Sequence, residues 1–210
     1  ALAAHALGTD PAEVRRAIAV DPNSTEGHAA LGVLLGYSGP EARQHLLRAA
    51  QLDPSNAEIQ VWLGVSHKGA GEFGQELAAY RRAYAIDPLW FRTSRDLAIA
   101  LADLGRRAEA EAVTRESHSV YQLEKDSLMA RVAWSFGDYS EAIRLWTVAS
   151  KAEGSAAKAT RRRAEIVRYY AGLTSRPPFE SAGSGVPRAA ADTGRGVIIG
   201  WLPGIPAPAE

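Results

Sequence analysis

The chain of 210 residues contains no cysteine and a single methionine. Without cysteine the protein has no disulfide bonds, zinc–thiolate sites, iron–sulfur clusters or thiol nucleophiles. The absence does not decide the compartment, since chains without thiols occur in both the cytoplasm and the periplasm. Both compartments stay open at this point, with the cytoplasm preferred.

A net charge is also lacking, because 24 lysines and arginines balance 24 aspartates and glutamates. Nucleic-acid affinity comes largely from an excess of cationic charge, so we do not expect nucleic acid as a partner. The longest apolar candidate, Val197–Leu202, is much shorter than the roughly 18 residues of a membrane-spanning helix, and no span is predicted. The chain opens at Ala1 rather than at methionine, which we interpret as a processed or truncated product.

Catalytic and metal-binding motifs are lacking as well. The glycines on either side of Arg195 follow no βαβ unit, and Ser184 lacks the strand–turn–helix context of a nucleophile elbow. No histidines have the spacing of metal ligands; the five are His5, His28, His45, His67 and His118. We therefore predict that the chain is not an enzyme and binds no cofactor or metal ion.

What the sequence does contain is a repeat. Asp-Pro recurs at intervals of 32 and 34 residues, at Asp21-Pro22, Asp53-Pro54 and Asp87-Pro88. After each Asp-Pro, and once more further on, a large residue precedes a small one: Leu31-Gly32, Leu63-Gly64, Leu97-Ala98 and Met129-Ala130. Glycines then mark turns at Gly39, Gly71, Gly105 and Gly137, and Glu-Ala follows at Glu41-Ala42, Glu109-Ala110 and Glu141-Ala142.

This pattern predicts pairs of helices. Small residues such as Gly32 and Gly64 allow two antiparallel helices to approach closely, and larger ones such as Leu46 and Tyr80 fill the space beside that contact. Because proline cannot continue a helix, each Asp-Pro ends one helix or starts the next. One position departs from the pattern, since Glu76 stands where alanine is usual.

A period near 34 with Leu-Gly, a glycine turn, Glu-Ala and Asp-Pro resembles the tetratricopeptide repeat. The resemblance covers roughly residues 1–153 and implies an all-α, right-handed α-solenoid of antiparallel helix pairs. The alanine- and arginine-rich style suggests a bacterial protein. Family resemblance further implies a concave groove that binds an extended peptide or a helix of a partner protein.

The repeat divides the chain into successive segments. We predict a truncated repeat over 1–22, and tetratricopeptide-like repeats over 23–54, 55–88, 89–122 and 123–153. A helix over 154–175 is expected to cap the last apolar surface, and its cationic face could instead dock an acidic partner. Over 176–210 the proline- and glycine-rich composition predicts an irregular tail. The apolar segment Val197–Leu202 within this tail could dock in the groove of its own chain or in that of a neighbouring copy. Docking on a neighbouring copy would give a homo-oligomer.

Projecting the repeat register onto the first helix of each pair gives the residues expected to face the groove. They are Val61, Val65, Lys68, Arg92, Arg95, Ile99, Arg131 and Trp134. Because arginine pairs carboxylates with two parallel hydrogen bonds, this mixture favours an apolar segment that carries acidic groups or a free C-terminus. The alternative is that these arginines are ordinary solvated residues on an exposed helix face.

Three functions agree with this organisation. The first is a protein-interaction scaffold that holds a partner segment in its groove, as the interaction or sensory part of a larger bacterial regulator. The second is a targeting or structural repeat domain of a larger enzyme, such as a glycosyl- or sulfotransferase. The third is a self-associating assembly factor that uses its tail.

Overall fold

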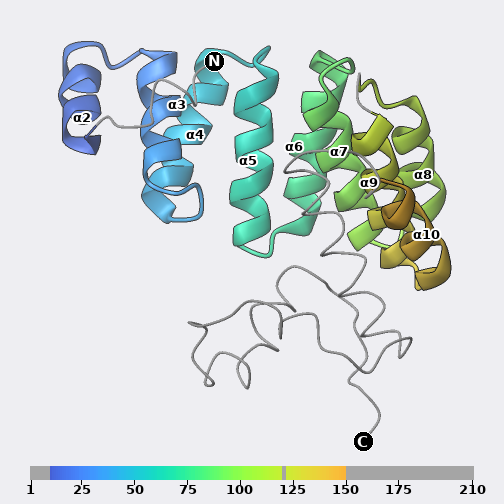
Figure 1. Cartoon of the computed structure of the whole chain (residues 1–210). Coiled ribbons are helices and arrows are strands. Elements are labelled where there is room, and N and C mark those ends of the chain that lie inside the picture. Colours follow the sequence, from blue (N-terminus) through green and yellow to red (C-terminus); the bar gives the residue numbers. More distant parts are fainter. Residues whose placement is uncertain (1–9, 120–121, 150–210) are drawn as a thin grey trace, which may run out of the picture. The chain divides into compact units, whose positions relative to one another are not determined.

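A computed structural model of the chain describes residues 10–119 and 122–149 (Figure 1). The regular elements in these ranges are all α-helices, as the sequence predicts: α2 (Pro11–Val20), α3 (Thr25–Leu34), α4 (Pro40–Leu52), α5 (Ala57–Gly69), α6 (Phe73–Ile86), α7 (Phe91–Asp103), α8 (Arg107–Glu116), α9 (Gln122–Ser135) and α10 (Tyr139–Ala149). The predicted capping helix over 154–175 and the tail over 176–210 lie outside the described residues.

The chain forms two compact units, and the boundary between them falls within α7. Of the described residues, 10–100 belong to unit 1, and 101–119 and 122–149 belong to unit 2. In unit 1, α3 packs on α4 and α5 on α6, and α4 also contacts α5; in unit 2, α9 packs on α10. Short turns join the partners of each pair, which makes them antiparallel neighbours.

The three periodic Asp-Pro dipeptides each end a helix through the aspartate as well as through the proline. The aspartate is the C-cap residue of α2, α4 and α6 in turn. Its Oδ1 then accepts a hydrogen bond from the backbone N–H two residues later, which builds the following turn. The three bonds are Asn23 N–H to Asp21 at 3.0 Å, Ser55 N–H to Asp53 at 3.1 Å, and Leu89 N–H to Asp87 at 3.1 Å.

Polar side chains open the helix that follows each of these turns. The Ser24 hydroxyl oxygen accepts the Gly27 N–H at 3.0 Å, and Asn56 Oδ1 accepts the Ile59 N–H at 3.2 Å. These bonds satisfy amide groups that have no partner within their own helix. At the third junction Thr93 instead donates its hydroxyl to the Asp87 carbonyl at 2.6 Å.

The turns within the pairs use left-handed backbone. Gly71, Gly105 and Gly137 have φ values of 73°, 74° and 78°, where glycine meets no steric penalty. The sequence assigned the corresponding turn of the first pair to Gly39, and this was wrong: Gly39 is the extended N-cap of α4, with φ −77°. The reversal lies earlier, at Gly36 and Tyr37, which have φ values of 80° and 66° and follow the end of α3 at Leu34.

Close approach of helix backbones forms the core of unit 1. A Cβ atom added to Gly64 on α5 would lie 2.3 Å from Cε1 of Tyr80 on α6, and one added to Gly32 would lie 2.6 Å from Cγ of Leu46. The predicted contacts of small residues with large ones are therefore confirmed. Around them, a cluster from α3 to α6 excludes water: Ala29, Leu46, Ala49, Ile59, Trp62, Leu63 and Ala79.

Arginines connect one helix pair to the next within each unit. Arg15 on α2 pairs with Glu41 on α4 at 2.7 Å, and Arg43 on α4 pairs with Glu72 at the start of α6 at 2.9 Å. In unit 2, Arg107 on α8 pairs with Asp138, the residue before α10. Each acid lies at a helix N-terminus, where the helix dipole favours negative charge.

Two histidines that lie far apart in the sequence meet between α3 and α4. Nδ1 of His28 lies 2.8 Å from Nδ1 of His45, so one of these atoms carries the shared proton. Burial lowers the pKa of the His45 imidazole, and the charges of His28 and Arg15 lower it further, against the opposing effect of Glu41. Sequence spacing gave no sign of this contact.

The glycine contact predicts a matched pair of substitutions. Gly64→Ala should lower the free energy of unfolding by about 1–3 kcal/mol, because the added methyl group overlaps the buried Tyr80 ring. Gly74→Ala in α6 meets nothing within 4 Å and should be neutral or stabilising by about 0.5–1 kcal/mol. Urea titration followed by circular dichroism measures both. Equal stability of the two variants would contradict the packing described.

The histidine pair predicts acid sensitivity. Because the pKa of His45 is lower in the folded chain than its ordinary value, the unfolded chain binds the proton more tightly. Stability should therefore be intact above the ordinary value of about 6.5 and should fall as the pH drops below it. His45→Gln should flatten this slope in urea titrations across that range. His118→Gln, at an exposed residue, should leave it unchanged; an equal slope in wild type and His45→Gln would refute the prediction.

Candidate peptide-binding pocket

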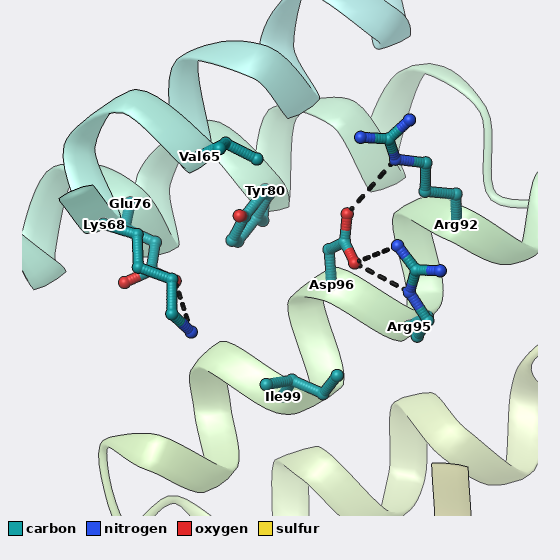
Figure 2. A pocket seen from close by; sticks show the side chains of 8 residues that line it. All are labelled: Val65, Lys68, Glu76, Tyr80, Arg92, Arg95, Asp96 and Ile99. Carbon is teal, nitrogen blue, oxygen red and sulfur yellow. Dashed lines mark hydrogen bonds and ion pairs between the residues drawn. The ribbon is translucent and has the colours of Figure 1, made fainter. Parts of the chain in front are cut away.

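A pocket of about 200 Å³ lies in unit 1 between α5, α6 and α7 (Figure 2). The helical period places its residues, because side chains three, four or seven positions apart share a face. Residues of this kind are Val65 and Lys68 on α5, Glu76 and Tyr80 on α6, and Arg92, Asp96 and Ile99 on α7. Arg95, next to Asp96, completes the lining.

Five of the eight residues predicted for the groove meet in this pocket: Val65, Lys68, Arg92, Arg95 and Ile99. Three further residues line the pocket that the sequence did not predict: Glu76, Tyr80 and Asp96. Glu76 and Tyr80 belong to the second helix of a pair, whereas the groove was expected to be lined by first helices. Asp96 lies on the first helix α7, between the predicted residues Arg95 and Ile99. The sequence held one sign that Glu76 has a special position, namely that this acidic residue replaces the alanine of the repeat pattern.

The other three predicted residues lie elsewhere. Val61 is fully buried and Trp134 is 4% exposed, so neither side chain lines an open groove, which corrects the prediction for both. Trp134 packs on Tyr139 and Trp146 in unit 2, with ring centroids 4.8 and 6.3 Å away. Arg131, also in unit 2, is paired with Asp103 at 3.1 Å.

The arginines of the pocket are held by one carboxylate. Asp96 Oδ1 accepts hydrogen bonds from Arg95 at 2.8 Å, and Oδ2 lies 3.5 Å from Nε of Arg92 (Figure 2). Its side chain is only 12% exposed, whereas those of Arg92 and Arg95 are 32% and 44% exposed. The Arg92 guanidinium also lies 5.8 Å from the ring centroid of Trp90, a cation–π arrangement. Asp96 therefore contacts both of these arginines of the pocket.

On the opposite wall, Lys68 Nζ lies 3.5 Å from Oε1 of the nearly buried Glu76. Between the two walls, burial raises the pKa of the Tyr80 phenol, and the negative charges of Asp96 and Glu76 raise it further. The pocket thus offers three cationic side chains, two carboxylates, a neutral phenol and two aliphatic side chains.

Within residues 10–119 and 122–149, no group of three or more histidine, aspartate or glutamate side chains is placed to hold a metal ion. Among the helices of the same ranges, none combines the length and apolar character that crossing a bilayer requires.

Comparison with solved structures identifies the fold. The chain has the tetratricopeptide-repeat fold, an α-solenoid class built from helix pairs. MamA matches with 18% identity and a TM-score of 0.56, over 73% of this chain and 87% of its own. TTC0263, a tetratricopeptide-repeat protein of Thermus thermophilus, matches with 19% identity and a TM-score of 0.59, over 75% and 88%. Pseudomonas aeruginosa PilF matches with 19% identity and a TM-score of 0.57, over 91% and 82%.

Sequence comparison adds one curated relative. The chain is 32% identical over 99 residues to the probable UDP-N-acetylglucosamine–peptide N-acetylglucosaminyltransferase SPINDLY of Hordeum vulgare. The match covers 46% of this chain, which spans only a tenth of the length of that relative. No family model matches the chain.

Proposed function

We propose that the chain is a protein-interaction module and that the pocket between α5, α6 and α7 binds a segment of a partner protein. The observation that carries the proposal is the meeting of Val65, Lys68, Arg92, Arg95 and Ile99 around one pocket. Tetratricopeptide resemblance had assigned these residues to a groove that binds peptides. The fold supports the same role, since repeats of helix pairs present long binding surfaces.

The chemistry of the pocket suits a partner segment that is apolar and carries a carboxylate. Val65 and Ile99 line it from different helices and provide aliphatic contact for a side chain. Arg92 and Arg95 line the pocket and can donate charge-assisted hydrogen bonds to a carboxylate. An acidic side chain or a free C-terminus supplies that group.

Loss of the two arginines should weaken capture of the partner. We expect Arg92→Ala/Arg95→Ala in the full chain to recover at least about tenfold less partner than wild type, because each removed charge-assisted bond contributes on the order of 1.5–3 kcal/mol. Affinity capture from the source organism, with quantitative mass spectrometry, measures the recovery.

The matched control is Arg81→Ala/Arg82→Ala, which removes two adjacent exposed arginines of α6 that do not line the pocket. Circular dichroism should show equal helicity in both double variants. If the Arg92/Arg95 variant captures the same proteins in the same amounts as wild type, the pocket is not the binding site.

A second candidate is that the chain is the repeat domain of a larger enzyme. The partial match to a probable N-acetylglucosaminyltransferase favours it, since this chain corresponds to a small part of that protein. Sequencing the complete gene and measuring the mass of the native protein by immunoblot test the idea. A glycosyltransferase domain in the same open reading frame is the expected result. A native protein of 22.4 kDa would overturn this candidate.

A further inference from the structure

We propose that Asp96 limits the charge of the pocket, so that it takes a partner segment with one carboxylate beside an apolar side chain and disfavours runs of acidic residues. This inference rests on the proposed binding function and names the class of partner. Its basis is the position of Asp96 between Arg92 and Arg95.

The lining charges nearly cancel. Lys68, Arg92 and Arg95 contribute three positive charges, and Glu76 and Asp96 contribute two negative ones, which leaves one positive charge. Without Asp96 the same lining would carry two. Complementarity of charge selects partners mainly by penalising the wrong ones, and here that penalty falls on a second carboxylate.

The geometry divides each guanidinium into an inner and an outer side. Asp96 engages Nε of Arg92 and both Nε and Nη2 of Arg95. Figure 2 shows the terminal nitrogens of Arg92, and one of those of Arg95, directed away from Asp96. A ligand carboxylate can therefore bind the outer side of these arginines while Asp96 stays in place.

The low exposure of the acids makes their charge felt inside the pocket. The side chains of Asp96 and Glu76 are 12% and 4% exposed, so water screens them little. A first carboxylate in the pocket compensates the single net charge of the lining. A second carboxylate in the same pocket adds negative charge near Asp96 and Glu76 and is repelled.

A panel of short synthetic peptides tests this selectivity on the full wild-type chain by fluorescence anisotropy. All peptides share one length and one leucine. Four arms carry no carboxylate, a single internal glutamate with an amidated end, a free C-terminus alone, or a run of three glutamates. We expect one or both single-carboxylate arms to bind at least about threefold more tightly than the neutral and triacidic arms. The two single-carboxylate arms show which source of the group is preferred.

Asp96→Asn removes the charge and keeps the shape of the side chain. In this variant the triacidic peptide should bind roughly tenfold more tightly than in wild type and should overtake the single-carboxylate peptides. Glu13→Gln is the control, since it also removes one negative charge but lies on α2, where its side chain is 61% exposed. It should leave the order of affinities unchanged. Asp96→Ser repeats the test if the asparagine variant does not fold.

The outcomes separate the two proposals. If peptides bind wild type and depend on Arg92 and Arg95, but the triacidic peptide binds best, the inference about Asp96 is overturned and the binding function stands. The same holds if Asp96→Asn leaves the order of affinities unchanged. If no peptide of the panel binds either chain, the proposed peptide site fails, and the inference about Asp96 fails with it.

Discussion

The close contact of Gly64 with Tyr80 is the interaction on which unit 1 depends. The absence of a side chain at Gly64 lets α5 and α6 approach until the phenol ring fills the space beside the glycine. Gly32 and Leu46 repeat the arrangement between α3 and α4. Two helices that pack this closely bury apolar surface, and this burial is the main source of stability in a repeat too small to fold alone.

The same contact builds the pocket. One face of the Tyr80 ring covers Gly64, and the residue also lines the pocket between Lys68 and Asp96. The Tyr80 side chain therefore takes part both in the packing of α5 on α6 and in the lining of the pocket. A change in the contact between Gly64 and Tyr80 would also displace this part of the lining. Charges complete the site because α7 brings Asp96 to the buried phenol, with Arg92 and Arg95 on either side of the carboxylate.

Much of the fold was predictable because its signals are local. Asp53 and Pro54 end a helix by their own chemistry, and Gly71 adopts the left-handed backbone that its turn needs. Assignment of a side chain to the groove was less secure. Val61 and Val65 are both valines and lie one helical turn apart on α5. Val65 nevertheless lines the pocket, whereas Val61 is fully buried.

The period, the all-α fold and the chemistry of the turns at Gly71, Gly105 and Gly137 follow from the sequence, since these depend on neighbouring residues and on the spacing of small and large side chains. Which faces stay accessible follows from the packing of the helices. This packing placed Trp134 in a core and Asp96 between two arginines, and it brought His28 to His45. The exposure of a side chain and its contacts depend on how helices from different parts of the sequence pack together. A local sequence pattern does not specify this packing.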